Sequence, residues 1–231
     1  MLATIMNQLQ EQWAVIWDMR DLFWEATLET LYMLGLTIIF AGTLGLLLGI
    51  LITVTGEGGI LEQPLIYKIC DVLINIFRSI PFIILLALLG GFTAWLVGTR
   101  IGSTAASVPI IVATIPFFAR QVEIALLEVD PGVVEAAQAM GSSPWDIIVR
   151  VYLREGLPAL LRVSASTVIN VIGLIAMAGV VGGGGLGTVA IARGYNRNRL
   201  DIILVSTVLI LLIVFISQMI FNLLIRLVTR R

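Results

Sequence analysis

The sequence predicts an all-α integral membrane protein with five transmembrane helices. Of its 231 residues, 59% are hydrophobic and 13% are charged, whereas soluble domains average roughly 45–50% apolar and about 25% charged residues. Five stretches carry no charge, and each is long enough for a helix to cross a bilayer core of about 30 Å. Helices satisfy their own backbone hydrogen bonds in hydrocarbon, and the Leu/Ile-rich runs lack the alternation of an outer-membrane barrel. The uncharged stretches are residues 30–56, 79–99, 101–119, 163–192 and 202–225.

Residues 1–29 form a separate amino-terminal segment, expected to be extracytoplasmic or interfacial. Trp13 and Trp17 are four residues apart and therefore share a helix face. Tryptophan favours the headgroup level of a membrane. No cleavable signal is apparent, because the first cationic residue is Arg20 and the segment has mixed polarity. We therefore expect a lead-in helix followed by one transmembrane domain over residues 30–231.

The elements of that domain follow in order from glycine, proline and charge positions. Gly45 and Gly49 are spaced so that another helix can approach the first span closely. Pro81 is expected to kink the second span. The third span continues past two further prolines before a charged connection leads to the fourth. The expected spans are about 30–54, 71–96, 105–121, 158–180 and 201–228, with a cytoplasmic loop over 122–157.

The distribution of basic residues predicts the orientation of the chain. Five crossings place the termini on opposite sides, and Lys and Arg accumulate on the cytoplasmic side. With the carboxyl terminus inside, nine basic residues face the cytoplasm and five face outwards. This favours an outside amino terminus, although the outer arginines between 193 and 199 run against it. The inner set is Lys68, Arg78, Arg120, Arg150, Arg154, Arg162, Arg226, Arg230 and Arg231; the outer set is Arg20, Arg100, Arg193, Arg197 and Arg199.

The composition excludes several classes of function. There is no histidine, and the single cysteine is Cys70. An internal disulfide, a His/Cys metal site and Ser-His or Cys-His catalytic pairs are therefore excluded. The only lysine, Lys68, is not in the Gly-Lys-Ser/Thr context of a phosphate-binding loop. A net charge of -1 gives no reason to expect nucleic-acid binding. We expect no catalytic, cofactor or metal site in this chain.

The loop over 122–157 carries signals for two short helices that meet at a glycine. Asp130 can cap a helix that begins at Pro131, and Gly141 can end it. Ser143 then precedes a proline and starts the second helix, in a pattern that resembles a capping box.

The first of these helices has a compact apolar surface. Ala136, Ala137 and Ala139 lie beside Met140. Such a face can enter a groove on another protein with little loss of side-chain entropy. It can equally pack on the protein's own spans, and the helix signals do not distinguish the two.

This loop resembles the cytoplasmic EAA motif of ATP-binding-cassette (ABC) importer permeases. Glu135-Ala136-Ala137 is followed after three residues by Gly141, as in that motif. Arg154 stands where the motif later has proline, and Pro158 follows four residues on. Flanking strings resemble methionine-importer permeases most closely; they are Asn75 to Phe82, Ala125 to Glu128, and Gly182 to Gly187.

The resemblance implies a type I ABC importer permease in a bacterial cytoplasmic membrane. Two copies of the chain would form the pore for L-methionine, with D-methionine or related amino acids as further candidate cargo. Two separate ABC ATPase subunits would bind ATP and Mg and receive the helices that carry Glu135, Ala136, Ala137 and Gly141. An external substrate-binding protein would deliver the cargo. Met177 matches the position of a pore-narrowing methionine in these permeases, although methionine in a span is otherwise usually lipid-facing or core.

Three alternative functions remain open at this stage. The chain could be an ABC permease for another amino acid or a short peptide. An ion-coupled secondary transporter would need ion-coupling groups in its spans, and the central parts of all five stretches lack acidic residues. A membrane scaffold would not require the docking pattern. A dinucleotide site at Gly182, Gly184 and Gly187 is disfavoured, because these glycines follow a membrane helix rather than a strand.

Several charged residues have competing interpretations. Arg78 could line a cavity and attract a carboxylate, but a position near the inner end of the second span favours snorkelling to headgroups or an ion pair. Arg120 and Glu123 are three apart and are expected to pair. Glu128 and Asp130 could meet basic residues of an ATPase or be solvated.

Overall fold

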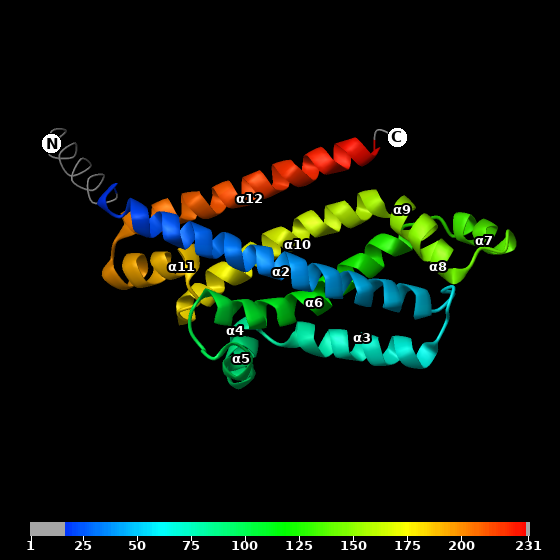
Figure 1. Ribbon diagram of the computed structural model, residues 1–231, viewed down its shortest axis with the longest axis horizontal. Coiled ribbons are helices and arrows are strands. Elements are labelled where there is room, and N and C mark those ends of the chain that lie inside the picture. Colours follow the sequence, from blue (N-terminus) through cyan, green and yellow to red (C-terminus); the bar gives the residue numbers. More distant parts are fainter. Residues whose placement is uncertain (1–16, 230–231) are drawn as a thin grey trace.

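The computed structural model describes residues 17–229, which form a bundle of helices without a strand in that range (Figure 1). Four described helices are long and apolar enough to cross a membrane. A bent pair, α3 and α4, makes a fifth crossing when it is counted as one span. The four long helices are α2 (Arg20–Thr55), α6 (Ser103–Leu127), α10 (Leu157–Ala178) and α12 (Leu200–Thr229).

Helix α2 runs through residue 30 without a break. The expected division between a lead-in helix and a first span at residues 29 and 30 therefore does not interrupt the backbone. Trp17 and Trp24 are 68% and 65% exposed, as suits side chains that reach the headgroup level. Trp13 lies outside the described residues.

Glycine allows α2 and α6 to pack closely, as the spacing of Gly45 and Gly49 predicts. A Cβ atom on Gly49 would lie 2.5 Å from the Cβ of Val122 and 2.8 Å from the carbonyl oxygen of Ala119. A Cβ on Gly45 would lie 3.1 Å from the Ile115 carbonyl. The two backbones therefore approach as far as glycine permits.

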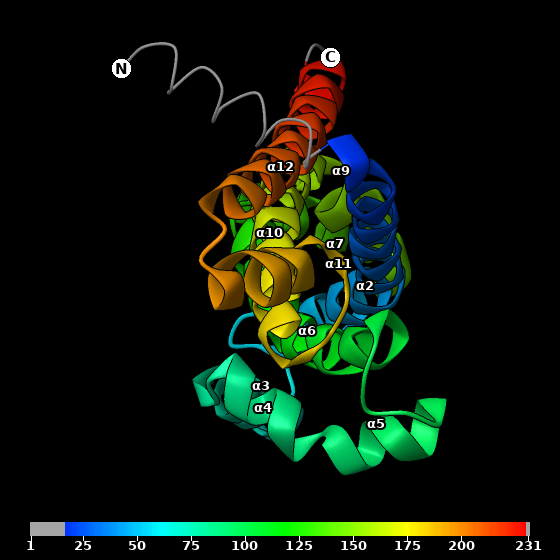
Figure 2. The same ribbon diagram turned by 90° about the vertical axis from the view of Figure 1, so that its left-hand side faces the viewer.

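The second crossing differs most from the sequence expectation. Helix α3 (Pro64–Ser79) begins before residue 71, and it ends two residues before Pro81. Helix α4 (Phe82–Leu88) then departs at 101°, and α5 (Gly90–Val97) follows on the side of the bundle away from α12 (Figure 2). The kink at Pro81 is confirmed, but residues 71–96 are not one helix. Lys68 interrupts the apolar run, which hides the true helix start from a hydropathy argument.

The last two crossings agree with their expected bounds within one to two residues. Between α10 and α12, a glycine-rich turn leads into α11 and then back towards the bundle. This connection consists of η2 (Gly179–Val181), α11 (Gly185–Thr188), η3 (Val189–Gly194) and η4 (Tyr195–Arg197).

The start of α2 and the end of α12 lie at opposite ends of the bundle (Figure 1). Two short helices, α7 (Pro131–Ala139) and α8 (Pro144–Ile147), project from the same end as the end of α12. We call this pair the elbow. It lies beside one of two main clusters of buried apolar side chains, formed by α6, α10 and the end of α2.

Candidate functional site

The elbow has the caps that the sequence predicts. Asp130 Oδ1 accepts a hydrogen bond of 2.8 Å from the backbone N–H of Gly132. At the other end of α7, Gly141 has φ +79°, and its N–H bonds the carbonyl of Gln138 at 2.9 Å. The N–H of Ser142 bonds the carbonyl of Ala137 at 3.1 Å. This pair of bonds is a Schellman motif, which favours glycine because its central residue is left-handed.

The two faces of α7 have different surroundings. Val134 and Ala137 are 8% and 6% exposed and pack among side chains of α6, α8 and α10. Glu135 and Ala136 face outwards. The expectation that three alanines share one outward face is therefore wrong for Ala137, because Ala137 packs against the bundle. The inner face packs on the protein's own spans while the outer face stays open.

The outer surface of the elbow carries large apolar side chains. Met140 is 79% exposed, Trp145 is 72% exposed and Val133 is 44% exposed. We call these three residues the elbow patch. Exposed apolar groups of this size outside the spans are typical of a protein interaction surface.

The elbow continues into α10 through helical backbone. After α8, a π-helical segment η1 (Ile148–Tyr152) and one turn α9 (Leu153–Glu155) lead to Gly156. Two hydrogen bonds span the bend at Gly156, since the Gly156 N–H bonds the Tyr152 carbonyl and the Leu160 N–H bonds the Gly156 carbonyl, although Pro158 has no N–H to donate. Burial raises the pKa of the Tyr152 phenol. The elbow and α10 are therefore joined without a flexible loop.

An ion pair between Arg162 and Glu128 joins the first turns of α10 to the end of α6, where the chain enters the elbow. Arg162 Nη2 lies 3.2 Å from Glu128 Oε2, just after α6. Glu128 thus has a partner within the chain, and Asp130 acts as a cap.

One face of α10 is exposed along its length. Its members recur every three or four residues and so share one side of the helix. Four of them are small, polar or charged, which is unusual for a surface that meets lipid tails. The exposed residues of this face are Arg162, Ser166, Asn170, Gly173 and Met177. Met177 lies at its far end and is 46% exposed.

A polar cavity of about 560 Å³ opens beside this face. Asn75, Arg78 and Ser79 line it from α3, and Asn170 lines it from α10. Arg78 is in the last turn of α3, not near the inner start of a span, because α3 begins earlier than expected. The apolar wall of the polar cavity includes Phe77, Ile80, Phe82, Ala113, Phe117 and Leu174.

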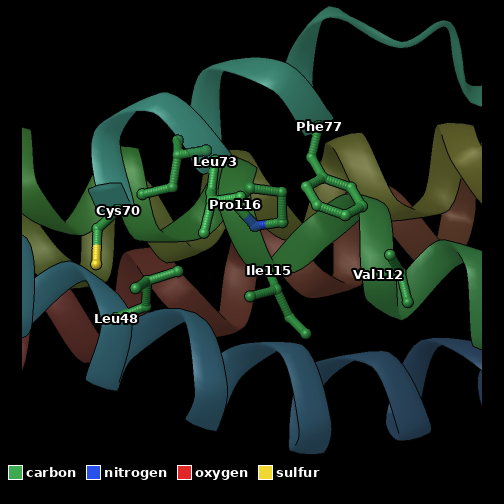
Figure 3. Close-up of a pocket in the computed structure, with 8 residues that line it drawn as sticks. Leu48, Cys70, Leu73, Phe77, Val112, Ile115 and Pro116 are labelled. Atoms are coloured by element: carbon green, nitrogen blue, oxygen red, sulfur yellow. The ribbon is translucent and has the colours of Figure 1, made fainter. Parts of the chain in front are cut away.

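A second pocket, of about 290 Å³, is almost entirely apolar (Figure 3). It lies between α2, α3 and α6, and it shares only Phe77 with the polar cavity. Its lining has no charged side chain that could bind the charged ends of an amino acid. The lining residues are Leu48, Cys70, Leu73, Ile74, Phe77, Val112, Ile115 and Pro116. Among the described residues, no three His, Cys, Asp or Glu side chains gather as metal ligands would.

The family of the chain follows from its similarity to known protein families. Residues 45–231 match the model of the binding-protein-dependent transport system inner membrane component. The chain belongs to this family. The match includes the elbow, α10 and the polar cavity.

Other inner membrane components align over nearly the whole chain. The probable D-methionine transport system permease protein MetI of Pasteurella multocida is 47% identical, over 88% of this chain and 92% of that protein. The methionine import system permease protein MetP of Bacillus subtilis is 45% identical, over 93% and 96%. An inward-facing structure of the MetNI methionine ABC transporter superposes with a TM-score of 0.89 at 40% identity, covering 91% of this chain and 98% of that one.

The sequence predicts only one of the two ion pairs that Arg120 makes in this inner membrane component. The expected pair is present, with Arg120 Nη1 2.5 Å from Glu123 Oε2. Arg120 also donates to Asp71 of α3, which itself accepts from Asn75 Nδ2 at 3.1 Å. Glu123 is only 5% exposed. Asp71 and Arg120 are 49 residues apart, so no local pattern could reveal this contact.

A second missed feature fixes the glycine-rich turn after α10. Glu29 Oε2 accepts a hydrogen bond of 2.6 Å from the Gly185 N–H, and Thr30 Oγ1 accepts one of 3.0 Å from the Leu186 N–H. A carboxylate is favoured at the amino end of a helix. Side chains of α2 therefore cap α11 and hold the turn against the bundle.

Proposed function

We propose that this chain is the membrane-spanning subunit of an ATP-driven ABC importer for methionine. The observation that carries the proposal is the similarity to methionine permeases from two organisms, at 47% and 45% identity over 88% and 93% of this chain. The chain itself would not hydrolyse ATP. ATP and Mg would bind to a separate ATPase, since the sequence has no phosphate-binding loop.

The elbow is the proposed contact with that ATPase. Glu135 and Ala136 belong to α7, the helix that would enter a groove of the motor, and Gly141 forms the turn that ends it. The elbow patch would be covered there. Ala137 contributes by holding α7 on the bundle. Because only the single residue Gly156 separates the helical turns after α8 from α10, movement of the motor would tilt α10 rather than bend a long loop. Such rigid-body motion can exchange two access states.

A second copy of the chain, two ATPase subunits and an external binding protein complete the proposed complex. The proposed setting is a bacterial cytoplasmic membrane, with the amino terminus outside. The outer arginines that oppose this orientation are partly neutralised, since Arg199 Nη2 lies 2.6 Å from Asp201. That hydrogen bond raises the pKa of Arg199. The family match argues against the secondary transporter and the scaffold.

Transport by the reconstituted complex tests the proposal. Vesicles that carry this chain with its ATPase and binding protein should accumulate labelled L-methionine only when ATP is present. Leucine, offered at the same concentration, serves as the control cargo. Uptake of methionine no faster than leucine would refute the substrate, and methionine accumulation by the chain alone would refute the need for a motor.

Met177 is the proposed gate of the pathway. A flexible thioether side chain can close against a partner and reopen without a fixed shape. Met177→Ala is expected to raise passive leak of methionine through vesicles without ATP, because the shorter side chain leaves the path wider. Met219→Ala is a matched control on α12, where Met219 is also exposed. Equal leak from the two variants would remove Met177 from the gate.

A further inference from the structure

The polar cavity holds an arginine whose charge has no partner among residues 17–229. Arg78 makes no ion pair in this range, and its side chain donates no hydrogen bond there. Arg120, the other arginine where α3 meets α6, is matched by two carboxylates. Helices α3 and α4 together form a candidate membrane span, and an unpaired cation in a span is costly and therefore typically marks a functional site.

Arg78 lies far along α3, and its side chain is exposed at the polar cavity that it lines. From Pro64 to Arg78, α3 rises about 21 Å at 1.5 Å per residue. Arg78 lies in the last turn of α3, where the helix dipole stabilises a cation. The end of the helix can thus support the charge while no anion is bound. An anion that arrives later would complete the site.

The walls of the cavity divide into a polar and an apolar side. Asn75, Ser79 and Asn170 add neutral hydrogen-bonding groups near Arg78. Phe82 and Phe117 provide aromatic surface, which suits a thioether side chain through sulfur–aromatic contact. The combination matches a small amino acid with one anionic end and an apolar side chain.

The cavity also has a defined place along the proposed path. Asn170 and Met177 share the exposed face of α10, and seven residues of helix separate them by about 10 Å. Asn170 lies nearer the elbow. Cargo in the cavity would therefore sit on the elbow side of the proposed gate.

We propose that this cavity is a transient cargo site, in which the Arg78 guanidinium pairs with the carboxylate of the amino acid while Phe82, Phe117 and Leu174 contact its side chain. This inference rests on the proposed function. A guanidinium can bind a carboxylate through two parallel N–H···O bonds, so the site selects for a free carboxylate.

Thiol protection tests the site in the complete complex with its ATPase. Cys70 is the only cysteine of the chain, so Cys70→Ala makes this chain thiol-free for Ser79→Cys, and labelling is read on this chain after the subunits are separated. Maleimide labelling at position 79 is measured against increasing L-methionine and against L-methioninol, which lacks the carboxylate. Methionine should slow labelling. The methioninol concentration that gives half protection should be about tenfold higher than the methionine concentration, which corresponds to about 1.4 kcal/mol.

Variants at Arg78 identify the pairing group. Arg78→Gln should raise the methionine concentration for half protection by about tenfold and leave protection by methioninol unchanged. Arg78→Lys should retain more of the protection, which guards against a folding defect, and co-purification of the ATPase checks assembly. Arg226→Gln removes the same charge from the exposed end of α12 and should change nothing.

The outcomes separate this inference from the proposed function. If methioninol protects as well as methionine, if neither protects, or if Arg78→Gln behaves like Arg226→Gln, the cargo site is refuted. Uptake of methionine by the unsubstituted complex is measured in parallel. Failure of that uptake refutes the proposed function, whereas intact uptake with no dependence on Arg78 refutes only the site.

Discussion

Arg120→Met is expected to lower the free energy of unfolding by about 3–5 kcal/mol, the usual cost of removing one partner from a buried ion pair. The substitution leaves Glu123, which is 5% exposed, without its cation. It also removes the partner of Asp71, and with it the polar contact that joins α3 to α6. Unfolding of the chain in nanodiscs, followed by helical signal against denaturant, measures the change.

Two controls separate the buried network from a general effect of lost charge. Arg120→Met combined with Glu123→Gln and Asp71→Asn should recover much of the stability, because no buried carboxylate is then unpaired. Arg150→Met removes an exposed pair with Asp146, in which the arginine side chain is 78% exposed, and should cost less than about 1 kcal/mol. Equal losses from Arg120→Met and Arg150→Met would contradict the role of the network.

Gly141→Val is expected to abolish most ATP-dependent uptake while the chain still inserts and folds. Gly141 has φ +79°, and a side chain in this conformation costs about 1–2 kcal/mol. A Cβ there would meet no atom within 4 Å, so the penalty arises from the backbone alone. The strain should shift the end of α7 and displace the elbow patch. Uptake is expected to fall roughly tenfold or more, as a 1.4 kcal/mol loss of the competent state would cause.

The matched controls test whether the shape of the elbow is what matters. Gly141→Asn should retain most of the uptake, because asparagine tolerates the left-handed conformation. Gly58→Val places the same strain, at φ +71° and also in open space, in the loop between α2 and α3. If Gly141→Val transports as fast as Gly58→Val, the elbow does not couple the motor to transport.

Local signals explain which parts of this molecule the sequence reveals. The caps at Asp130, Ser143 and Gly141 involve residues within a few positions of each other, so the elbow can be recognised before its surroundings are known. The close approach at Gly49 follows equally from spacing. The bounds of α10 and α12 follow from long uncharged runs.

The remaining features depend on contacts between distant segments. The 101° bend after α3 sets the path of the second crossing, and proline predicts only that a kink exists. The burial of Ala137 depends on the positions of α6 and α10. The place of Arg78 along its span does not follow from the sequence, because Lys68 interrupts the apolar run at the start of α3. Its cavity is lined in part by α6 and α10, which lie far away in the sequence.

The capping of α11 by α2 has a consequence for the order of biosynthesis. Glu29 and Thr30 are synthesised 156 residues before the amides that they accept. Thr30 Oγ1 can donate to the Ala26 carbonyl within α2 from the start, but neither oxygen can accept from α11 until the ribosome has made Gly185 and Leu186. The far end of this subunit is therefore completed late in translation, after its first and fourth crossings have met.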